Sequence, residues 1–131
     1  MTIPADFEPL FRTSPALDLI GPLYSRGERE NLVIGLRAEA KQCNARGTVH
    51  GGILATLADV ALGYTMAFSS DPSAALVTAN LSLDFAGTAK AGGLAGGPRR
   101  HSEARESRFV RIVRASAVFL VAGQLDAAAR T

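Results

Sequence analysis

The stretch from residue 44 to residue 59 decides the fold, and it reads Asn44-Ala-Arg-Gly47-Thr-Val-His50-Gly51-Gly52-Ile-Leu-Ala-Thr56-Leu-Ala-Asp59. Its first half is polar and turn-forming, whereas its second half begins an apolar run that continues to Phe68. A run of this length predicts a helix over residues 51–68. The following Ser69-Ser-Asp-Pro72 ends the helix, because proline cannot continue it and restricts the residue before it.

Strand-like segments surround this helix. Residues 75–85 alternate apolar Val77, Ala79, Leu81, Leu83 and Phe85 with polar Thr78, Asn80, Ser82 and Asp84. This alternation predicts a half-buried strand. Strands are also predicted in 31–39 and in 108–124, the latter as one strand or a bent pair with Gly123 as a turn or bulge. One helix followed by a run of strands predicts an α+β fold with an antiparallel sheet.

The composition fits one small domain that spans residues 1–131. With 47% apolar residues the chain has enough material for a core. Residues 1–22 form an N-terminal extension, with a helical piece expected from Ala5 to Phe11 and turns after it. The single Cys43 provides no disulfide framework, so we expect a reducing, cytoplasmic location.

The sequence predicts no membrane or nucleic-acid partner and no metal or separate cofactor. The apolar run is shorter than the roughly 20 residues of a membrane span and holds Asp59 at its middle. No His, Cys, Asp and Glu residues have metal-ligand spacing. A late basic segment holds only one aromatic residue, Phe109, whereas a nucleic-acid binder would normally pair such a stripe with several. The segment fits either a solvated face or a basic rim for a phosphorylated ligand. Its arginines are Arg99, Arg100, Arg105, Arg108, Arg111 and Arg114.

The start of the predicted helix has the features of an oxyanion site. The first amides of a helix have no intrahelical acceptor, and the helix dipole makes that end electropositive. Gly51 and Gly52 would let the carbonyl of a substrate approach these amides closely. The alternative is that the two glycines only permit the turn into the helix. His50 is better explained as a hydrogen-bonding residue at the helix start than as half of a catalytic dyad.

Asp59 is the candidate catalytic carboxylate. Apart from Tyr64, it is the only ionisable residue between His50 and Asp71. An unpaired carboxylate among apolar neighbours is costly to bury, which favours a functional reason for its presence. The alternative is a carboxylate at a solvated edge or one that is paired across an interface.

The two candidate groups cannot serve one substrate from one helix. Gly51 and Asp59 are eight residues apart, which corresponds to roughly 12 Å along a helix axis. The carbonyl carbon of a substrate must lie about 3 Å from its attacker while the carbonyl oxygen contacts the donor. The site must therefore combine Gly51 of one subunit with Asp59 of another, which predicts an obligate homodimer.

The block from Asn44 to Asp59 resembles the signature of hot-dog-fold acyl-CoA thioesterases of the phenylacetic-acid-degradation type. This resemblance implies an antiparallel β-sheet wrapped around one long central α-helix, an acyl-CoA substrate, and dimers that pair into a homotetramer. It also implies site residues: Asp59 as nucleophile or general base, the Gly51 amide as carbonyl-polarising donor, Asn44 as an orienting group, Thr78 near the attacking water, and His50, Gly52 and Thr56 as substrate-binding residues. The acyl group, whether aryl-acetyl, other aromatic or medium-chain, stays open.

Residues 92–107 depart from this pattern, because glycine, arginine, serine and glutamate replace the strand that the family has there. A divergent loop explains the segment, and so does a pair of compensating frame changes in the coding sequence. The departure keeps a second hypothesis open, a non-catalytic hot-dog protein that binds acyl-CoA or serves in assembly. A hydratase or dehydratase is disfavoured, since His50 and Asp59 are nine residues apart and form no local pair.

Overall fold

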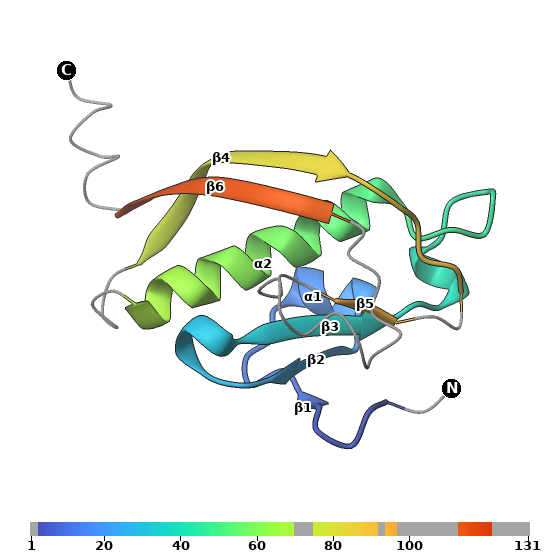
Figure 1. Ribbon diagram of the computed structural model, residues 1–131, viewed down its shortest axis with the longest axis horizontal. Coiled ribbons are helices and arrows are strands. Elements are labelled where there is room, and N and C mark those ends of the chain that lie inside the picture. The colour runs from blue at the N-terminus through green and yellow to red at the C-terminus, as the bar shows by residue number, and fades with distance from the viewer. Residues whose placement is uncertain (1–2, 70–74, 92–93, 97–112, 122–131) are drawn as a thin grey trace.

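The long apolar helix α2 lies between two antiparallel layers in the computed structural model (Figure 1). The structure describes residues 3–69, 75–91, 94–96 and 113–121. The elements follow in the order β1 (Glu8–Pro9), α1 (Pro15–Ile20), β2 (Leu23–Arg26), the 3-10 helix η1 (Arg29–Asn31), β3 (Val33–Arg37), the 3-10 helix η2 (Ala40–Gln42), α2 (Gly51–Ser69), β4 (Leu76–Phe85), β5 (Leu94–Gly96) and β6 (Val113–Val121).

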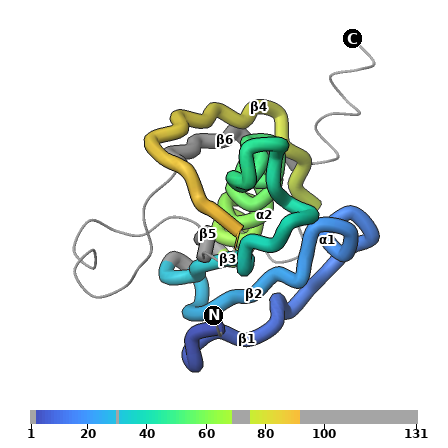
Figure 2. The backbone as a smooth tube through the Cα atoms, turned by 90° about the vertical axis from the view of Figure 1, so that its right-hand side faces the viewer, coloured from blue at the N-terminus to red at the C-terminus, as the bar shows by residue number. Residues whose placement is uncertain are grey.

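The strands form two separate ladders within the described residues. Strands β1, β2, β3 and β5 pair in that order, with Ser25 opposite Ile34 between β2 and β3. Strands β4 and β6 form the second ladder, with Leu83 opposite Ala115. The view in Figure 2 shows α2 with β4 on one side and β1 to β3 on the other. The expected α+β fold, with antiparallel strands around one central helix, is confirmed.

The core forms where α2 packs on the larger ladder. Its buried residues include Leu54, Leu57 and Ala61, which the three- and four-residue spacing of a helix places on one face. Opposite them, β3 is buried through Val33, Ile34, Gly35 and Leu36, as expected for a strand between two neighbours. The full cluster consists of Leu17, Leu23, Leu32, Ile34, Leu36, Ala38, Val49, Leu54, Leu57, Ala61 and Ala89.

The rest of α2 is more exposed than its composition suggests. The apolar run was expected to be too short for a membrane span, but residues Gly51–Phe68 are long and apolar enough to cross a membrane by length and composition. The same helix contacts β3, β4 and β6. Only 17% of these residues are buried. Most of the other residues of α2 are half-buried, and Met66 and Phe68 are exposed, so the single chain leaves apolar helix surface of the kind that a second subunit would cover.

One of the expected secondary-structure elements, the N-terminal helix, is placed differently. The prediction of a helix from Ala5 to Phe11 was wrong, since that segment holds a turn and the short strand β1. The helix comes later, as α1, because the Ser14 side chain accepts the Leu17 amide hydrogen at 3.3 Å and Pro15 suits the first helical position.

The late segments are described only in part. Within 108–124 the described residues form the single strand β6, and Gly123 lies outside the described residues. Of the anomalous segment 92–107, only Leu94–Gly96 is described, as β5 paired with β3. The late arginines lie outside the described residues except for Arg114 in β6.

Candidate active site

The loop that leads into α2 is organised by the side chain of Asn44. Its Oδ1 accepts hydrogen bonds from the amides of Arg46 at 2.9 Å and Thr48 at 3.3 Å, and its Nδ2 donates to Thr48 Oγ1 at 3.0 Å. The turn closes at Gly47, whose φ of 76° favours glycine. Most of the hydrogen-bonding groups of the Asn44 side chain are therefore bonded within its own loop. A carboxamide has two N–H groups, so one remains for the orienting role that the sequence suggested.

His50 caps the start of α2. Its Nδ1 accepts the Gly52 amide hydrogen at 2.9 Å, while its carbonyl accepts the amides of Ile53 at 2.9 Å and Leu54 at 3.2 Å. The interpretation of His50 as a hydrogen-bonding residue at the helix start fits this geometry. A neutral imidazole that accepts at Nδ1 carries its proton on Nε2. The exposed ring of His50 thus presents one N–H donor at the start of α2.

This cap leaves one particular amide available. Among the described residues, the Gly51 N–H has no acceptor, whereas Gly52 donates to His50. The ring of Phe85 lies beside Gly51, because a Cβ built there would be 3.5 Å from Phe85 Cζ. The helix start therefore offers an unused amide donor, which an oxyanion site requires, and an aromatic ring lies beside it.

Asp59 is paired with Thr78. The Thr78 hydroxyl donates to Asp59 Oδ1 at 2.7 Å, and the Asp59 carboxylate is half-buried on the side of α2 that faces β4. The structure thus brings together the carboxylate and the strand residue that the sequence placed in one site. One carboxylate oxygen is held by the hydroxyl, and the other oxygen remains for a water molecule or a carbonyl carbon.

A β-bulge in β4 makes this pairing possible. Thr78 lies opposite Phe119 and Asn80 opposite Val118, so Ala79 is an extra residue in β4. Thr78 and Phe85 are seven residues apart and would face opposite sides of a regular strand. Both contact α2, Thr78 at Asp59 and Phe85 at Gly51. The extra residue changes the phase of the strand and turns the Thr78 side chain toward the helix.

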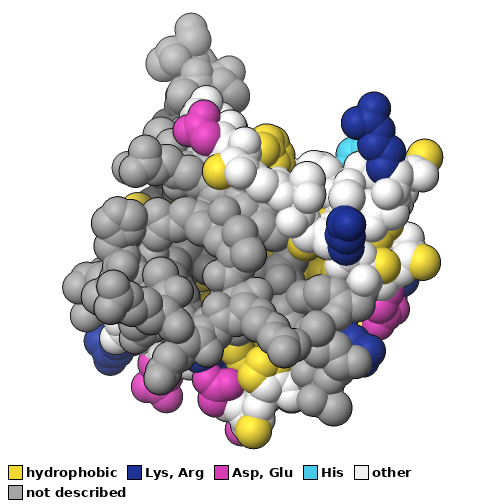
Figure 3. Space-filling model, turned by 45° about the vertical axis from the view of Figure 1, so that its right-hand side comes forward, with side chains coloured by type: hydrophobic (Ala, Val, Ile, Leu, Met, Phe, Trp, Pro, Cys, Tyr) yellow, Lys and Arg dark blue, Asp and Glu magenta, His cyan; other side chains and the backbone are white. Residues whose placement is uncertain are grey.

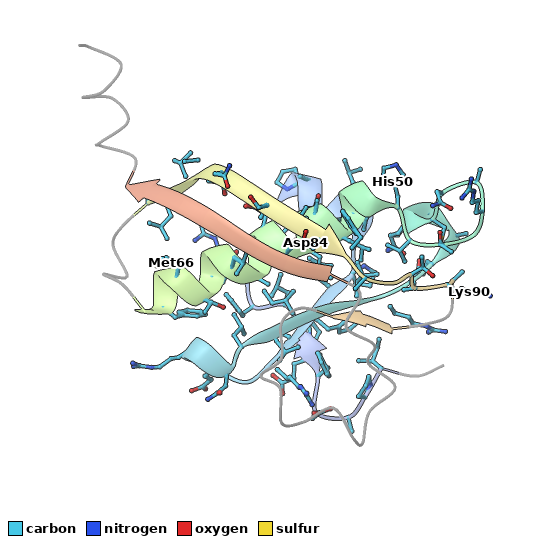
Figure 4. The ribbon with its side chains drawn as sticks, turned by 45° about the horizontal axis from the view of Figure 1, so that its top comes forward. His50, Met66, Asp84 and Lys90 are labelled. Atoms are coloured by element: carbon cyan, nitrogen blue, oxygen red, sulfur yellow. The ribbon has the colours of Figure 1, made fainter. Side chains whose placement is uncertain are left out.

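The remaining residues of the site lie along the same helix. Thr56 is half-buried, and its hydroxyl donates to the Gly52 carbonyl at 3.0 Å, which leaves its oxygen as an acceptor for a ligand. Figure 4 shows His50 and Met66 at opposite ends of α2, with Lys90 at the His50 end.

Two residues near the start of α2 were not recognised from the sequence as part of a site, Gln42 and Phe85. A glutamine in a polar loop and an apolar residue in a strand give no signal of a site.

Two exposed basic residues lie near the helix start. Arg46 and Lys90 are exposed, and Lys90 pairs with Thr48 in an isolated bridge that joins the loop to the segment after β4. Figure 3 shows that Lys and Arg side chains stand out on the right-hand part of the face it presents. Among the described residues, no group of three or more His, Cys, Asp and Glu is placed to hold a metal ion.

Comparison with known proteins agrees with this geometry. A model of the thioesterase superfamily matches residues 46–95, the segment that holds α2, β4 and the part of the loop that follows Asn44. A Pseudomonas aeruginosa protein named "Putative esterase PA0474" is 54% identical over 93 residues, which cover 70% of this chain and 69% of that protein. The chain belongs to the thioesterase superfamily. Family membership supports a hydrolase that acts on thioesters.

Solved structures give the same fold. This chain aligns with a Ralstonia eutropha phenylacetic acid degradation-related protein at a TM-score of 0.64 and 22% identity. The alignment covers 84% of this chain and 92% of the Ralstonia chain. It aligns with zebrafish thioesterase superfamily member 2 at a TM-score of 0.54 and 25% identity, covering 62% of this chain and 59% of the zebrafish chain. The chain thus spans less than two thirds of the zebrafish protein. The resemblance to hot-dog thioesterases, drawn from residues 44–59, is confirmed.

Proposed function

We propose that the protein is an acyl-CoA thioesterase in which Asp59 drives hydrolysis and the Gly51 amide stabilises the oxyanion. Water adds to the thioester carbonyl carbon, the carbon–sulfur bond breaks, and a carboxylic acid and the coenzyme A thiol leave. Asp59 either removes the proton of the water molecule or attacks the carbonyl carbon itself, forming an anhydride that water then cleaves. The observation that carries the proposal is the half-buried Asp59 carboxylate that accepts the Thr78 hydroxyl at 2.7 Å.

The site is completed by a second subunit in this proposal. Within one chain, Gly51 and Asp59 are eight residues apart on α2, or roughly 12 Å. Among the described residues β4 pairs only with β6, so its other edge is free to pair with the partner subunit's β4. The poorly covered surface of α2 gives such a dimer an apolar interface.

The contacts of β4 select a register for this pairing. Thr78 marks the position of Asp59 and Phe85 marks the position of Gly51. An antiparallel pair with its two-fold axis between Leu81 and Ser82 places Thr78 opposite the partner's Phe85. That register brings the partner subunit's Gly51 to the side of Asp59, and it forms two equivalent sites. Two such dimers would form the expected homotetramer.

The basic surface near the helix start indicates where the nucleotide end of the substrate lies. Arg46 and Lys90 are exposed beside the loop that precedes Gly51. Positive charge at this position attracts the phosphates of coenzyme A, and the attraction weakens as salt is added. The acyl group then extends toward Asp59 of the other subunit. An aryl-acetyl, aromatic or medium-chain group is proposed, and no further cofactor is needed because coenzyme A is part of the substrate. A cytoplasmic location, where acyl-CoA is available, is part of the same proposal.

The first experiment measures thiol release from a panel of acyl-CoA thioesters. We expect Asp59→Asn to lower kcat by about 10²- to 10⁴-fold, the usual contribution of a general base. Glu28→Gln removes the same charge at an exposed position and should leave kcat within about twofold of wild type. Full activity in Asp59→Asn would refute the mechanism. Acyl-CoA binding without turnover by the wild-type protein would instead support the non-catalytic alternative.

The second experiment tests whether the site is shared between subunits. Gly51→Pro removes the amide hydrogen at a helical position where proline is well tolerated, and Gly51→Ala is the matched variant that keeps it. When equal amounts of inactive Asp59→Asn and Gly51→Pro subunits are mixed and reassembled, each mixed dimer gains one intact shared site. Activity should then return to about a quarter of wild type, given random pairing of two subunits. No recovery in mixtures that contain mixed dimers would contradict a shared site.

A further inference from the structure

Gln42 is the only buried polar residue among the described residues, with 1% of its surface exposed. Every polar group of its side chain is bonded: Oε1 accepts the Glu39 amide hydrogen at 2.5 Å, and Nε2 donates to the Ile20 carbonyl at 2.5 Å. Its backbone carbonyl accepts the His50 amide hydrogen at 2.8 Å. A buried residue that is bonded through both ends of its side-chain amide and through its backbone carbonyl is fixed in place.

These bonds link the body of the domain to the start of α2. Ile20 is the last residue of α1, and Gln42 ends η2, which precedes the loop of Asn44. Through its carbonyl, Gln42 holds the backbone of His50, and His50 Nδ1 in turn accepts the Gly52 amide hydrogen. The chain of contacts therefore runs from α1 through Gln42 and His50 to the first turn of α2.

We propose that Gln42 is a positioning residue that decides which amide of α2 is left for the substrate. By holding His50, it keeps the Gly52 amide occupied and the Gly51 amide available. It also fixes the imidazole in the form with the proton on Nε2, because Nδ1 must accept. The inference rests on the proposed function for its effect on rate, whereas its effect on the imidazole does not depend on activity.

The kinetic test is a double-mutant cycle between Gln42 and His50. Gln42→Met keeps the length of the side chain and removes its hydrogen bonds, and Gln42→Glu keeps an acceptor but removes the donor. Either change should lower kcat about 10- to 100-fold with KM within about twofold, since a misplaced donor weakens the transition state more than the ground state. In a His50→Ala background the same change should lower kcat less than twofold. Independent, multiplying losses would overturn the proposal.

The second readout is the nitrogen-15 NMR spectrum of the imidazole. In the wild-type protein the His50 Nδ1 signal should be that of an unprotonated acceptor and the Nε2 signal that of an N–H; comparison with His50→Ala assigns these signals. In Gln42→Met the two signals should move toward each other as the two neutral forms mix. Mixed forms in the wild-type protein would overturn the proposal even if no Gln42 variant folds. A fixed form in an inactive wild-type protein would refute the proposed function alone.

Discussion

The stability of the loop before α2 should depend on glycine at position 47. The substitution Gly47→Ala measures its contribution to the free energy of unfolding. Gly47 has a φ of 76°, and a Cβ built there meets no atom within 4 Å. The change therefore tests backbone conformation without a steric clash. A left-handed conformation costs a non-glycine residue about 1–2 kcal/mol. Alanine recovers about 0.4–1 kcal/mol of this by restricting the unfolded chain. The net loss of unfolding free energy is about 1 kcal/mol.

Thermal unfolding measures this loss directly. An unfolding entropy of about 2.1 cal/mol/K per residue gives about 0.28 kcal/mol/K for a chain of 131 residues, so Tm should fall by about 4 °C. Asparagine tolerates the left-handed region, and Gly47→Asn should therefore lose less than Gly47→Ala. The comparison needs equal protein concentrations, since a dimer unfolds at a concentration-dependent temperature. A Tm for Gly47→Ala that equals or exceeds the wild-type value would refute the reasoning.

Two other changes test the helix cap and the N-terminal ion pair. In Gly52→Ala the new Cβ would lie 3.0 Å from His50 Nδ1, so the imidazole must shift and kcat should fall. Tm should change little, because the loss of the cap, about 1 kcal/mol, is offset by the higher helix propensity of alanine. An unchanged kcat together with a lower Tm would contradict this prediction. The Arg26 hydrogen bond lowers the pKa of Asp6, and a carboxyl with a lowered pKa stabilises the fold at neutral pH and loses that effect as pH falls. Thermal scans from pH 3 to 7 should therefore show that the Tm difference between wild type and Asp6→Asn shrinks below about pH 4. A Tm difference that grows as the pH falls would show that the ion pair is not the cause of the difference.

The central elements of the fold were predictable because their sequence patterns are strong. The apolar run gave α2 to within one residue at its end, and the alternation of residues 75–85 gave β4. The N-terminal helix was misplaced because residues 5–11 contain good helix formers, whereas the cap of Ser14 and Pro15 determines where the chain turns helical. The division of the strands into two ladders could not be predicted, since strand partners are set by tertiary packing and not by the alternation within each strand.

The site shows the same division between what local sequence contains and what packing decides. The spacing of Gly51 and Asp59 predicted a second subunit on the assumption that both act on one substrate, and the apolar run that follows the glycine pair indicated the helix. Gln42 and Phe85 act through contacts with segments distant in sequence, so no local pattern marked them.

Thr78 is the most instructive residue of the site. Regular alternation places it on the polar side of its strand, away from Leu81 and Leu83, and that pattern alone would turn its hydroxyl from the helix. The extra residue Ala79 reverses this phase, and the hydroxyl then donates to Asp59. A bulge has no sequence signature here, because alanine occupies it in place of glycine. The family resemblance nevertheless assigned Thr78 to the site, because a family motif records which positions belong to the site and does not depend on the geometry of the strand. Position in a family motif and position in a local pattern are therefore independent sources of information, and where they disagree about a strand residue, a bulge between them is the physical hypothesis to test.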